Sequence, residues 1–472
     1  MIDKIPGYVL SVSQKLENAG FESYIVGGSV RDMFLNLPLK DWDLTTNATP
    51  EQILKLFPDG FYDNSFGTVG VPINDGETEK IIEITTYRTE EGYSDNRRPD
   101  NVSWGTSIEE DLKRRDFTVN SIALKVSKSY GEPLASDSLH INKVPSEYSL
   151  SIVDPFNGQA DLKEKLIRSV LDPDERFKED ALRLMRAVRL ATQLSFAIEK
   201  NTLAAISRHA SDIQKISKER VRDELFKILN TDHPYEGIML LYQTGLLKYI
   251  LPEILEGIGV SQERPGRHHK DDVFTHNLNS LKTTPSKDPV VRFATLIHDV
   301  AKPRVRGTDN EGYVIFHNHE IVGSKMAYEI AERLRLSKKQ REKIVTLIRW
   351  HMFTVDENTT DASIRRFIRR VGVENIQDMI DLRIGDRLGS GTTTAESWRL
   401  KLFRKRIEEQ LAPAPFSIQD LAIDGRDIMA ELKIKPGPKI GEILQKLFEE
   451  VDEDLSKNTR DFLLSRTRAL AD

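Results

Sequence analysis

The spacing of hydrophobic and polar residues changes along the chain and divides it into two regions. Within the first 150 residues, short β-like apolar runs at 23–26 and 80–87 alternate with helical stretches. From about residue 162 onward the pattern is helical almost without interruption, with apolar residues three and four positions apart at 181–190 and 221–229. We therefore predict an α+β fold class, in which an N-terminal α/β head precedes predominantly helical domains.

Helix-start and helix-breaking residues refine this division. Thr49-Pro50-Glu51-Gln52 is typical of a helix start, with Thr49 as cap and Gln52 completing a capping box. Residues that break regular structure gather at 252–265, 283–289 and 411–415, which are candidate joints. We predict a head over 1–150, a helical neck over 151–255, a helical domain over 256–395 and a helical tail over 396–472.

Composition limits the class of protein. The 472 residues include no cysteine and no apolar run approaching 18 residues, and Met1-Ile2-Asp3-Lys4 lacks the layout of a signal peptide. A cytoplasmic protein without membrane association is expected, and no oligomeric state is specified. The net charge of −6 argues against a uniformly basic nucleic-acid binder. Local basic patches, which either contact RNA or form solvated helix faces, are Arg365, Arg366, Arg369 and Arg370, and residues 398–406.

Two aspartates one residue apart, Asp41 and Asp43, give the strongest chemical signal. On an extended strand their side chains point to the same face, where they could hold hard cations. Upstream, a strand runs into a turn whose backbone N–H groups could cradle phosphates. This turn has Gly27, Gly28 and a possible helix-capping Ser29, with Arg31 adding a cation one turn later.

Glu83 is a candidate third carboxylate. It lies within the apolar run Ile81-Ile82-Glu83-Ile84, where a charge is costly unless it is paired or binds metal. The alternative is an outward-facing glutamate on a half-buried strand. Two or three carboxylates suffice for Mg²⁺, and two such ions could activate a 3′-hydroxyl and bind leaving pyrophosphate.

Five ordered motifs give the chain a family resemblance. Together they resemble the class II CCA-adding tRNA nucleotidyltransferases of the DNA polymerase β superfamily, which implies Mg²⁺, CTP, ATP and tRNA as ligands. By this resemblance Asp116 and Asn120 contact the ribose, and Arg114 and Arg115 lie near the sugar and triphosphate; a salt-bridged turn is the alternative for the two arginines. The motifs are residues 27–43, 114–123, 154–158, 179–183 and 217–220.

Asp180 and Arg183, three apart on a predicted helix, could select the base. Aspartate only accepts hydrogen bonds and arginine only donates, which matches the amine and ring-nitrogen edge shared by cytosine and adenine. Uracil and guanine would leave buried polar groups unpaired. Glu179 could hold the arginine fork in plane, and a charged surface helix is the alternative. Further nucleotide-binding candidates on this helix are Arg186 and Arg189.

Residues 88–99 resemble the family's flexible loop, whose loss accompanies relatives that add only CC. The loop candidates are Arg88, Tyr93, Asp95 and Arg97. Their presence favours full CCA addition. The alternatives are a poly(A) polymerase, a partial CC- or A-adding enzyme, and an HD phosphohydrolase with an RNA-binding head.

A second set of potential ligands lies in the helical region. Imidazole and carboxylate groups in this mixture suit Ni²⁺, Mn²⁺, Co²⁺ or Zn²⁺. The His298-Asp299 doublet and its flanking residues resemble the HD phosphohydrolase superfamily, which implies hydrolysis of phosphate esters. Asn318 stands where that family usually has glycine, and His317 competes with His319 as a ligand. The six candidates are His276, His298, Asp299, His319, His351 and Asp386.

Overall fold

The computed structural model describes two compact units, Met1–Pro252 and Glu253–Asp472. The division after Pro252 lies at the start of the candidate joint 252–265. The finer domain limits remain predictions. The described residues are 2–39, 41–62, 67–74, 79–91, 101–105, 107–128, 148–263, 271–353, 356, 359–411 and 417–471. Among them, no helix is both long and apolar enough to cross a membrane.

The first unit begins with a mixed seven-stranded sheet in the order β3-β4-β5-β2-β1-β8-β9. β2 and β5 run parallel, and the other neighbouring strands run antiparallel. The predicted strands at 23–26 and 80–87 are β1 and β5. The bounds are β1 Tyr24–Val26, β2 Asp43–Thr46, β3 Phe61–Tyr62, β4 Thr68–Asn74, β5 Glu79–Thr86, β8 Ala123–Lys128 and β9 Tyr148–Val153.

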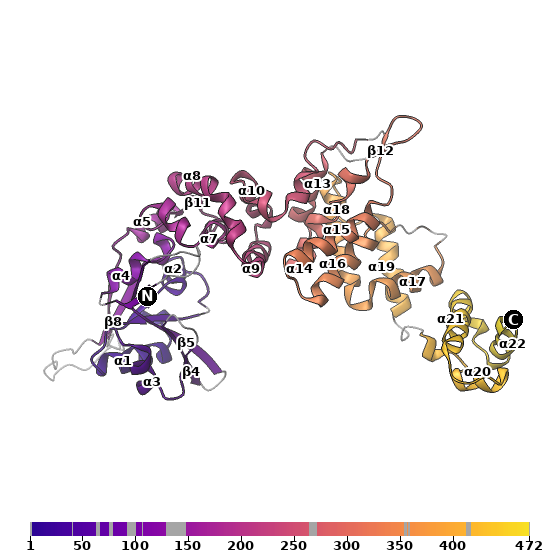
Figure 1. Cartoon of the computed structure of the whole chain (residues 1–472), viewed down its shortest axis with the longest axis horizontal. Coiled ribbons are helices and arrows are strands. Elements are labelled where there is room, and N and C mark those ends of the chain that lie inside the picture. Colours follow the sequence, from indigo (N-terminus) through magenta and orange to yellow (C-terminus); the bar gives the residue numbers. More distant parts are fainter. Residues whose placement is uncertain are drawn as a thin grey trace, which may run out of the picture. The chain divides into compact units, whose positions relative to one another are not determined.

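Short helices accompany this sheet, as the indigo and purple part of Figure 1 shows, and one antiparallel hairpin follows β5. The predicted helix start is confirmed, because the Thr49 hydroxyl accepts from the Gln52 N–H while the Gln52 side chain accepts from the Thr49 N–H. The elements are α1 Gly7–Asn18, α2 Gly28–Phe34, α3 Pro50–Leu56, α4 Ile108–Lys113 and the hairpin β6 Arg88–Glu91 with β7 Asn101–Trp104.

Apart from the short parallel pair β10 Leu166–Ile167 and β11 Ala197–Ile198, the described remainder of the first unit is mostly helical, as the apolar spacing predicts. α7 is the central element and packs against α9 and α10, with Leu184, Met185 and Val188 fully buried. The helices are α5 Gly158–Glu164, α6 Pro173–Glu179, α7 Leu182–Leu194, α8 Lys200–His209, α9 Lys218–Leu229, α10 Pro234–Gln243 and α11 Leu247–Ile250; α12 Pro252–Leu255 spans the division.

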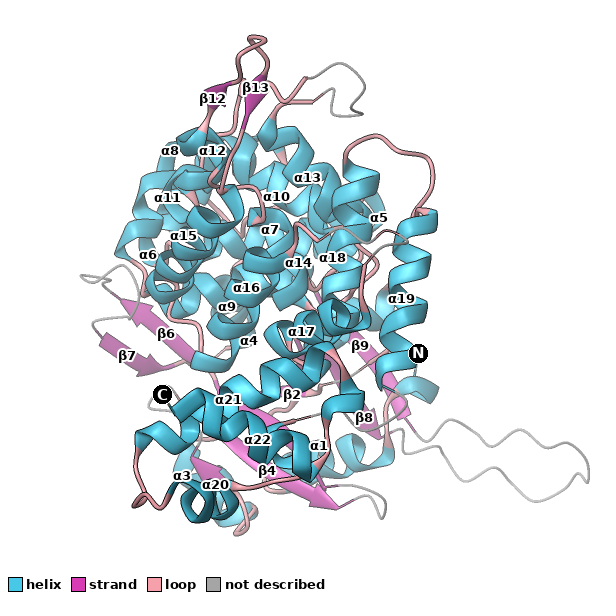
Figure 2. Cartoon of the chain, turned by 90° about the vertical axis from the view of Figure 1, so that its right-hand side faces the viewer, coloured by secondary structure: helices cyan, strands magenta, loops and turns pink. Residues whose placement is uncertain are grey.

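The second unit is also helical, apart from the short antiparallel pair β12 Gly307–Thr308 and β13 Val314–Ile315, drawn in magenta in Figure 2. A separate apolar cluster around Ile428, Leu447 and Leu463 holds the last three helices together. The helices are α13 Val273–Thr283, α14 Pro289–Ile297, α15 His319–Arg333, α16 Lys338–Trp350, α17 Asp361–Val371, α18 Ile376–Gly389, α19 Trp398–Leu411, α20 Gly425–Leu432, α21 Pro438–Glu453 and α22 Arg460–Ala471.

Two arginines of a predicted basic patch join α17 to α21. Arg365 Nε donates to Oδ1 of Asp452 at 2.8 Å, and Arg369 Nη1 donates to the same oxygen at 3.2 Å. Asp452 is 1% exposed. Both arginines are used in an ion pair with a buried carboxylate, so they do not form a simple solvated face, and RNA contact by the patch stays a prediction.

We expect Asp452→Ala to lower the free energy of unfolding of the second unit by about 3 kcal/mol, since it leaves two arginines without their buried carboxylate. Urea unfolding followed by circular dichroism measures this. Arg468→Ala is the control, because Arg468 is 69% exposed in its pair with Glu431 and its loss should cost about 0.5 kcal/mol or less. Equal losses in the two variants would contradict a structural role for the α17–α21 pair.

Candidate active site

Sheet register brings the predicted carboxylates together. Asp43 opens β2, and its partner on the parallel strand β5 is Glu83. Side chains in register on adjacent strands point to the same face. Glu83 is exposed while Ile82 and Ile84 are buried, so the idea of a charge enclosed in an apolar run is wrong. Glu83 faces outward because the strand alternates, yet this outward face is the one that carries Asp43.

Asp41 completes this group from just before the strand. Trp42 between the two aspartates is 4% exposed, whereas Asp41 is exposed. Burial raises the pKa of Asp43, the charge of Arg115 opposes that rise, and the like charge of Asp41 adds to it. Carboxylates gathered in this way favour a bound cation, so the residues present fit the divalent metal that this type of site uses.

The glycine turn lies against the same carboxylates. Gly27 has φ +79°, and a Cβ placed there would lie 3.2 Å from Asp43 Oδ2 and 3.3 Å from Arg115 Nη1. Only a glycine fits both the left-handed backbone and this close approach. α2 begins directly at Gly28. The prediction that Ser29 caps this helix is wrong, because Ser29 already lies inside it and its hydroxyl donates to the Val26 carbonyl at 3.1 Å.

A line of polar contacts runs from α2 to α7. The buried Arg31 donates through Nη1 to Asn120 Oδ1 at 2.8 Å, and Asn120 Nδ2 donates to Asp116 Oδ1 at 3.4 Å. Arg186 Nε donates to Asp116 Oδ2 at 2.7 Å. Burial alone would raise the pKa of Asp116, but attraction to Arg186 and its hydrogen bond hold the value at about 2. Asp116 is therefore ionised at neutral pH.

Arg114 and Arg115 both pair with Asp111, a residue that the sequence interpretation missed. Arg114 Nε donates to Asp111 Oδ1 at 2.9 Å, and Arg115 Nη2 donates to Oδ2 at 3.2 Å. The salt-bridged turn is thus present, although Arg115 also faces Gly27. The signal that could have identified Asp111 is its spacing, three and four residues before two consecutive arginines at a helix end.

The expectation that Asp180 and Arg183 share one helix is wrong. α6 ends at Glu179, Asp180 has an extended backbone with φ −143°, and Arg183 lies in the first turn of α7. The chain breaks here because Asp180 Oδ1 accepts from the N–H of Leu182, while Oδ2 accepts from Arg220 at 2.8 Å.

Glu179 pairs with Arg183, as the sequence predicts. Arg183 Nη1 pairs with the Glu179 carboxylate and donates to the Arg176 carbonyl at 3.1 Å. Arg183 Nη2 reaches the Arg114 carbonyl at 3.4 Å. Arg183 is therefore linked, through the Arg114 carbonyl, Asp111 and Arg115, to the Gly27 turn that lies beside Asp43.

Not every candidate joins that group. Arg189 lies further along α7 and donates to Glu224 of α9 at 2.6 Å, which indicates a structural pair. Arg88 opens the hairpin strand β6. Tyr93, Asp95 and Arg97 lie outside the described residues.

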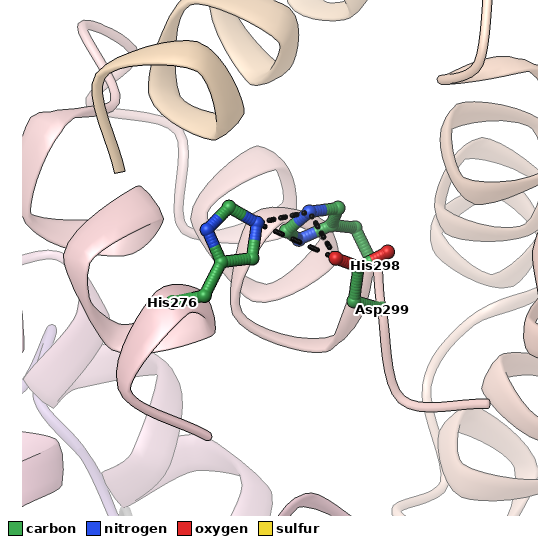
Figure 3. Close-up of side chains that lie close together, drawn as sticks. All are labelled: His276, His298 and Asp299. Carbon is green, nitrogen blue, oxygen red and sulfur yellow. Dashed lines mark hydrogen bonds and ion pairs between the residues drawn. The ribbon is translucent and has the colours of Figure 1, made fainter. Parts of the chain in front are cut away.

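The second unit gathers all six remaining candidates. His276 Nε2 lies 3.4 Å and His298 Nε2 3.3 Å from Asp299 Oδ2 (Figure 3). His276 Nε2 also lies 3.2 Å from Asp386 Oδ1. On the other side of Asp299, His319 Nε2 and His351 Nε2 lie 3.4 and 3.8 Å from Oδ1. Asp299 thus offers one oxygen atom to each pair of histidines.

Backbone carbonyls orient three of these imidazoles. Nδ1 of His298, His319 and His351 lies 2.8, 2.8 and 2.6 Å from the carbonyls of Thr295, Phe316 and Ile348. A carbonyl only accepts, so each of these Nδ1 atoms carries a proton and each Nε2 faces inward, where it could coordinate a metal ion once deprotonated. His276 Nε2 and His298 Nε2 are 3.3 Å apart, as are those of His319 and His351. Imidazole nitrogens that converge on carboxylates form a donor set that fits a transition metal.

The structure separates His319 from its competitor. His319 is buried in the cluster, whereas His317 is exposed. Asn318 between them has φ +59°, a conformation that asparagine tolerates better than most residues, so it can replace the glycine expected there.

Without a metal, protons on the histidines balance the negative charge of Asp299 and Asp386. Burial lowers the pKa of His298, but Asp299 and Asp386 raise it to about 10. Burial, reinforced by the charge on His298, lowers the pKa of His351 to about 3. A buried Lys302 also lies 2.5 Å from Asp299 Oδ2. The cluster thus favours added positive charge, which a metal ion would supply in place of protons.

Comparison with known proteins bears on both units. The family model described as the Poly A polymerase head domain matches residues 23–168, that of the probable RNA and SrmB-binding site of polymerase A matches 195–257, and that of putative domain 2 of tRNA nucleotidyltransferase matches 321–466. These three models together span much of both units.

Whole-chain relatives agree with these matches. A CCA-adding enzyme of Latilactobacillus sakei is 31% identical over 467 residues, covering 97% of each chain. An A-adding tRNA nucleotidyltransferase of Deinococcus radiodurans is 35% identical over 356 residues, covering 73% of this chain and 75% of that protein. The solved CCA-adding enzyme of Bacillus stearothermophilus in complex with CTP is 25% identical with a TM-score of 0.70, covering 98% of this chain and 97% of that one. As its motifs predict, the chain belongs to the family of CCA-adding tRNA nucleotidyltransferases.

Proposed function

We propose that this protein adds C, C and A in turn to the 3′ end of tRNA, without a template, using CTP and ATP and releasing pyrophosphate. The observation that carries the proposal is the arrangement of residues from Asp43 to Arg183. The Asp43 carboxylate, the Gly27 turn and the Arg183 guanidinium are linked within one unit, which supports a shared nucleotide site. Membership of the CCA-adding family and a relative solved with CTP support the same activity.

Asp41, Asp43 and Glu83 would hold Mg²⁺ on the open face of the sheet. When bound, such ions supply the charge that activates a 3′-hydroxyl and stabilises the leaving pyrophosphate. Asp43 is the central ligand in this proposal, because it adjoins both Glu83 in register and the Gly27 turn.

The turn and its arginines would hold the nucleotide. Backbone N–H groups at Gly27 and Gly28 and the guanidinium of Arg115 would meet the triphosphate, and Asp116 with Asn120 would meet the ribose. Ser29, Arg31, Arg114 and Arg186 would hold these groups in place through the contacts that they make here.

Asp180 and Arg183 would read the base although they do not share a helix. Arg183 would donate to the ring-nitrogen acceptor of cytosine or adenine, and Asp180 would accept from the exocyclic amine. Uracil and guanine reverse both groups, which costs roughly 1 to 3 kcal/mol for each unpaired buried group. Residues 88–99 would provide the switch from C to A addition. A tRNA substrate is consistent with the cytoplasmic location that the sequence predicts.

We also propose a metal-dependent phosphohydrolase site formed by the six histidine and aspartate residues of the second unit. The observation that favours it is the inward convergence of imidazole nitrogens around Asp299, with Asp386 closing one side. A metal held there would supply Lewis acidity toward a phosphate ester, while the chain fixes the imidazoles through their Nδ1–carbonyl bonds.

Incubating tRNA that lacks its last three nucleotides with CTP and ATP should give a single product ending in CCA. Asp41→Ala and Asp43→Ala should each lower the rate by roughly a hundredfold or more, since metal stabilisation of the transition state amounts to several kcal/mol. Radiolabelled nucleotides resolved on sequencing gels measure each addition.

Other products identify the alternatives. A long A tail would show a poly(A) polymerase, and extension only of tRNA already ending in CC would show an A-adding enzyme, as in the Deinococcus relative. Unchanged activity in Asp41→Ala would contradict the proposed catalytic role of the head.

Gly27→Ala should lower kcat/KM for CTP at least roughly tenfold, because the new methyl group meets Asp43 and Arg115 in a left-handed backbone that costs about 1 to 2 kcal/mol. Gly20→Ala is a matched control: φ is +87° there, but nothing lies within 4 Å of the added Cβ. Steady-state rates and thermal unfolding of both variants separate the two effects. If both lose stability equally and both keep full activity, the Gly27 turn does not bind the nucleotide.

For the second site, chelated protein reloaded with Mn²⁺ or Ni²⁺ should retain metal after desalting and hydrolyse a 2′,3′-cyclic phosphate. His298→Ala should lose both properties, and His317→Ala, which removes an exposed histidine, should keep both. Elemental analysis and phosphate-ester assays measure this, with CCA addition as an internal check on folding. Equal metal content in His298→Ala and the unmodified protein would refute the site.

A further inference from the structure

Asp111 is a buried carboxylate that has no role in the reaction proposed above. It lies on α4, its side chain has no exposed surface, and its pKa, which burial would raise, is lowered by Arg114 and Arg115. An ionised carboxylate at such a position is costly unless it is paired. Asp111 is paired here with two arginines, so its effect is exerted on them.

One carboxylate here fixes two guanidinium groups in different directions. Arg114 meets Oδ1 and Arg115 meets Oδ2, because the arginines lie three and four residues after Asp111 at the end of α4. Two positive charges share one negative charge, so the group keeps a net positive charge. Arg115 directs Nη1 to the Gly27 turn, and its Nε is buried with no acceptor among the described residues.

We propose that Asp111 is a positioning residue, which holds the Arg115 fork toward the triphosphate of the bound nucleotide; this deepens the proposed nucleotidyl transfer and rests on it. An arginine side chain has about 2 kcal/mol of rotamer entropy, and a partner that fixes its fork beforehand reduces the loss on binding. Asp111 acts through Arg115 and does not itself touch the nucleotide.

The base-reading side is held by different side chains. Arg183 pairs with Glu179 and donates to the Arg176 carbonyl. Among the described residues, its links to the end of α4 go to backbone carbonyls: Arg183 reaches the Arg114 carbonyl at 3.4 Å, and Arg176, which also pairs with Glu179, donates to the Lys113 carbonyl at 2.7 Å. Loosening Arg115 should therefore weaken triphosphate binding without changing which base is chosen.

Asp111→Asn should raise KM for CTP and for ATP together by about tenfold, with kcat changed much less, because an amide cannot pair with two guanidinium groups as a carboxylate does. The preference for CTP over UTP should stay unchanged. Glu179→Gln should do the opposite, lowering that preference with a smaller effect on KM. Equal changes of KM and base preference in the two variants would overturn the proposal.

Asp452→Asn controls for the loss of any buried carboxylate shared by two arginines, because Asp452 holds Arg365 and Arg369 in the same way. It should lower the unfolding temperature and leave KM for CTP and ATP unchanged. If Asp111→Asn likewise affects only stability, Asp111 is merely structural and the proposal fails.

A double variant tests whether Asp111 works through Arg115. Arg115→Ala should raise KM, and adding Asp111→Asn should raise it no further; multiplicative effects would contradict the mechanism. If Asp111→Asn does not fold, Arg115→Lys decides, since it keeps the charge but loses the fork: unchanged KM for both nucleotides refutes the proposal, and a rise in both supports it. Equilibrium dialysis of CTP reports on Asp111 independently, so a failure of tRNA extension would count against the proposed function alone.

Discussion

The proposed head site depends on the close packing of Asp43 and Arg115 against the backbone at Gly27. This packing joins the sheet, the turn before α2 and the end of α4 at one point, and it fits only because residue 27 has no side chain. The positive charge of Arg115 partly offsets the cost of placing Asp43 in a half-buried position beside another carboxylate, although the pKa of Asp43 is still raised. A substrate that brings its own negative charge and its own cations can then enter a site whose charges are already in place.

The same physical device serves different purposes elsewhere. Asp111 and Asp452 are both buried carboxylates shared by two arginines. The first pair of arginines lies at the proposed nucleotide site, and the second joins two helices of the second unit. Asp111 and Asp452 each accept hydrogen bonds from two guanidinium groups, so this contact does not distinguish the two roles. The difference lies in what the far side of each guanidinium faces: the Gly27 turn for Arg115, and the Phe448 ring for Arg369, whose guanidinium lies 4.8 Å from that ring.

Local patterns in the sequence predict the elements of this fold well, because their causes are local. The Thr49 capping box and the strands around Val26 and Ile84 depend on spacing and side-chain chemistry within a few residues. The motifs likewise predict that Asp43, Asp116 and Arg183 serve one site in the first unit. Spacing fails where a side chain competes for the backbone: Asp180 accepts from the Leu182 N–H and ends a helix that its apolar pattern would continue.

Partners far apart in sequence could not be predicted in the same way. Nothing near Arg365 or Arg369 shows that Asp452 lies between them, so a helix with four arginines reads as a surface for RNA. Glu83 reads as enclosed by isoleucines because the sequence does not state which face of β5 is covered. Tertiary packing decides both cases, and it supplies the opposite charge or the open face that spacing alone does not reveal.

Helix ends account for the second cluster in a way that relates its fold to its chemistry. His298 and His351 stand directly after the last residues of α14 and α16, where backbone carbonyls lack helical partners. Each imidazole uses its Nδ1–H to satisfy one of those carbonyls, and this single bond also turns Nε2 toward Asp299. Ending the helix and orienting the ligand are therefore one interaction. A histidine moved one residue along either helix would lose the carbonyl partner and the inward direction together, which explains how short helices can hold so many imidazoles around one carboxylate.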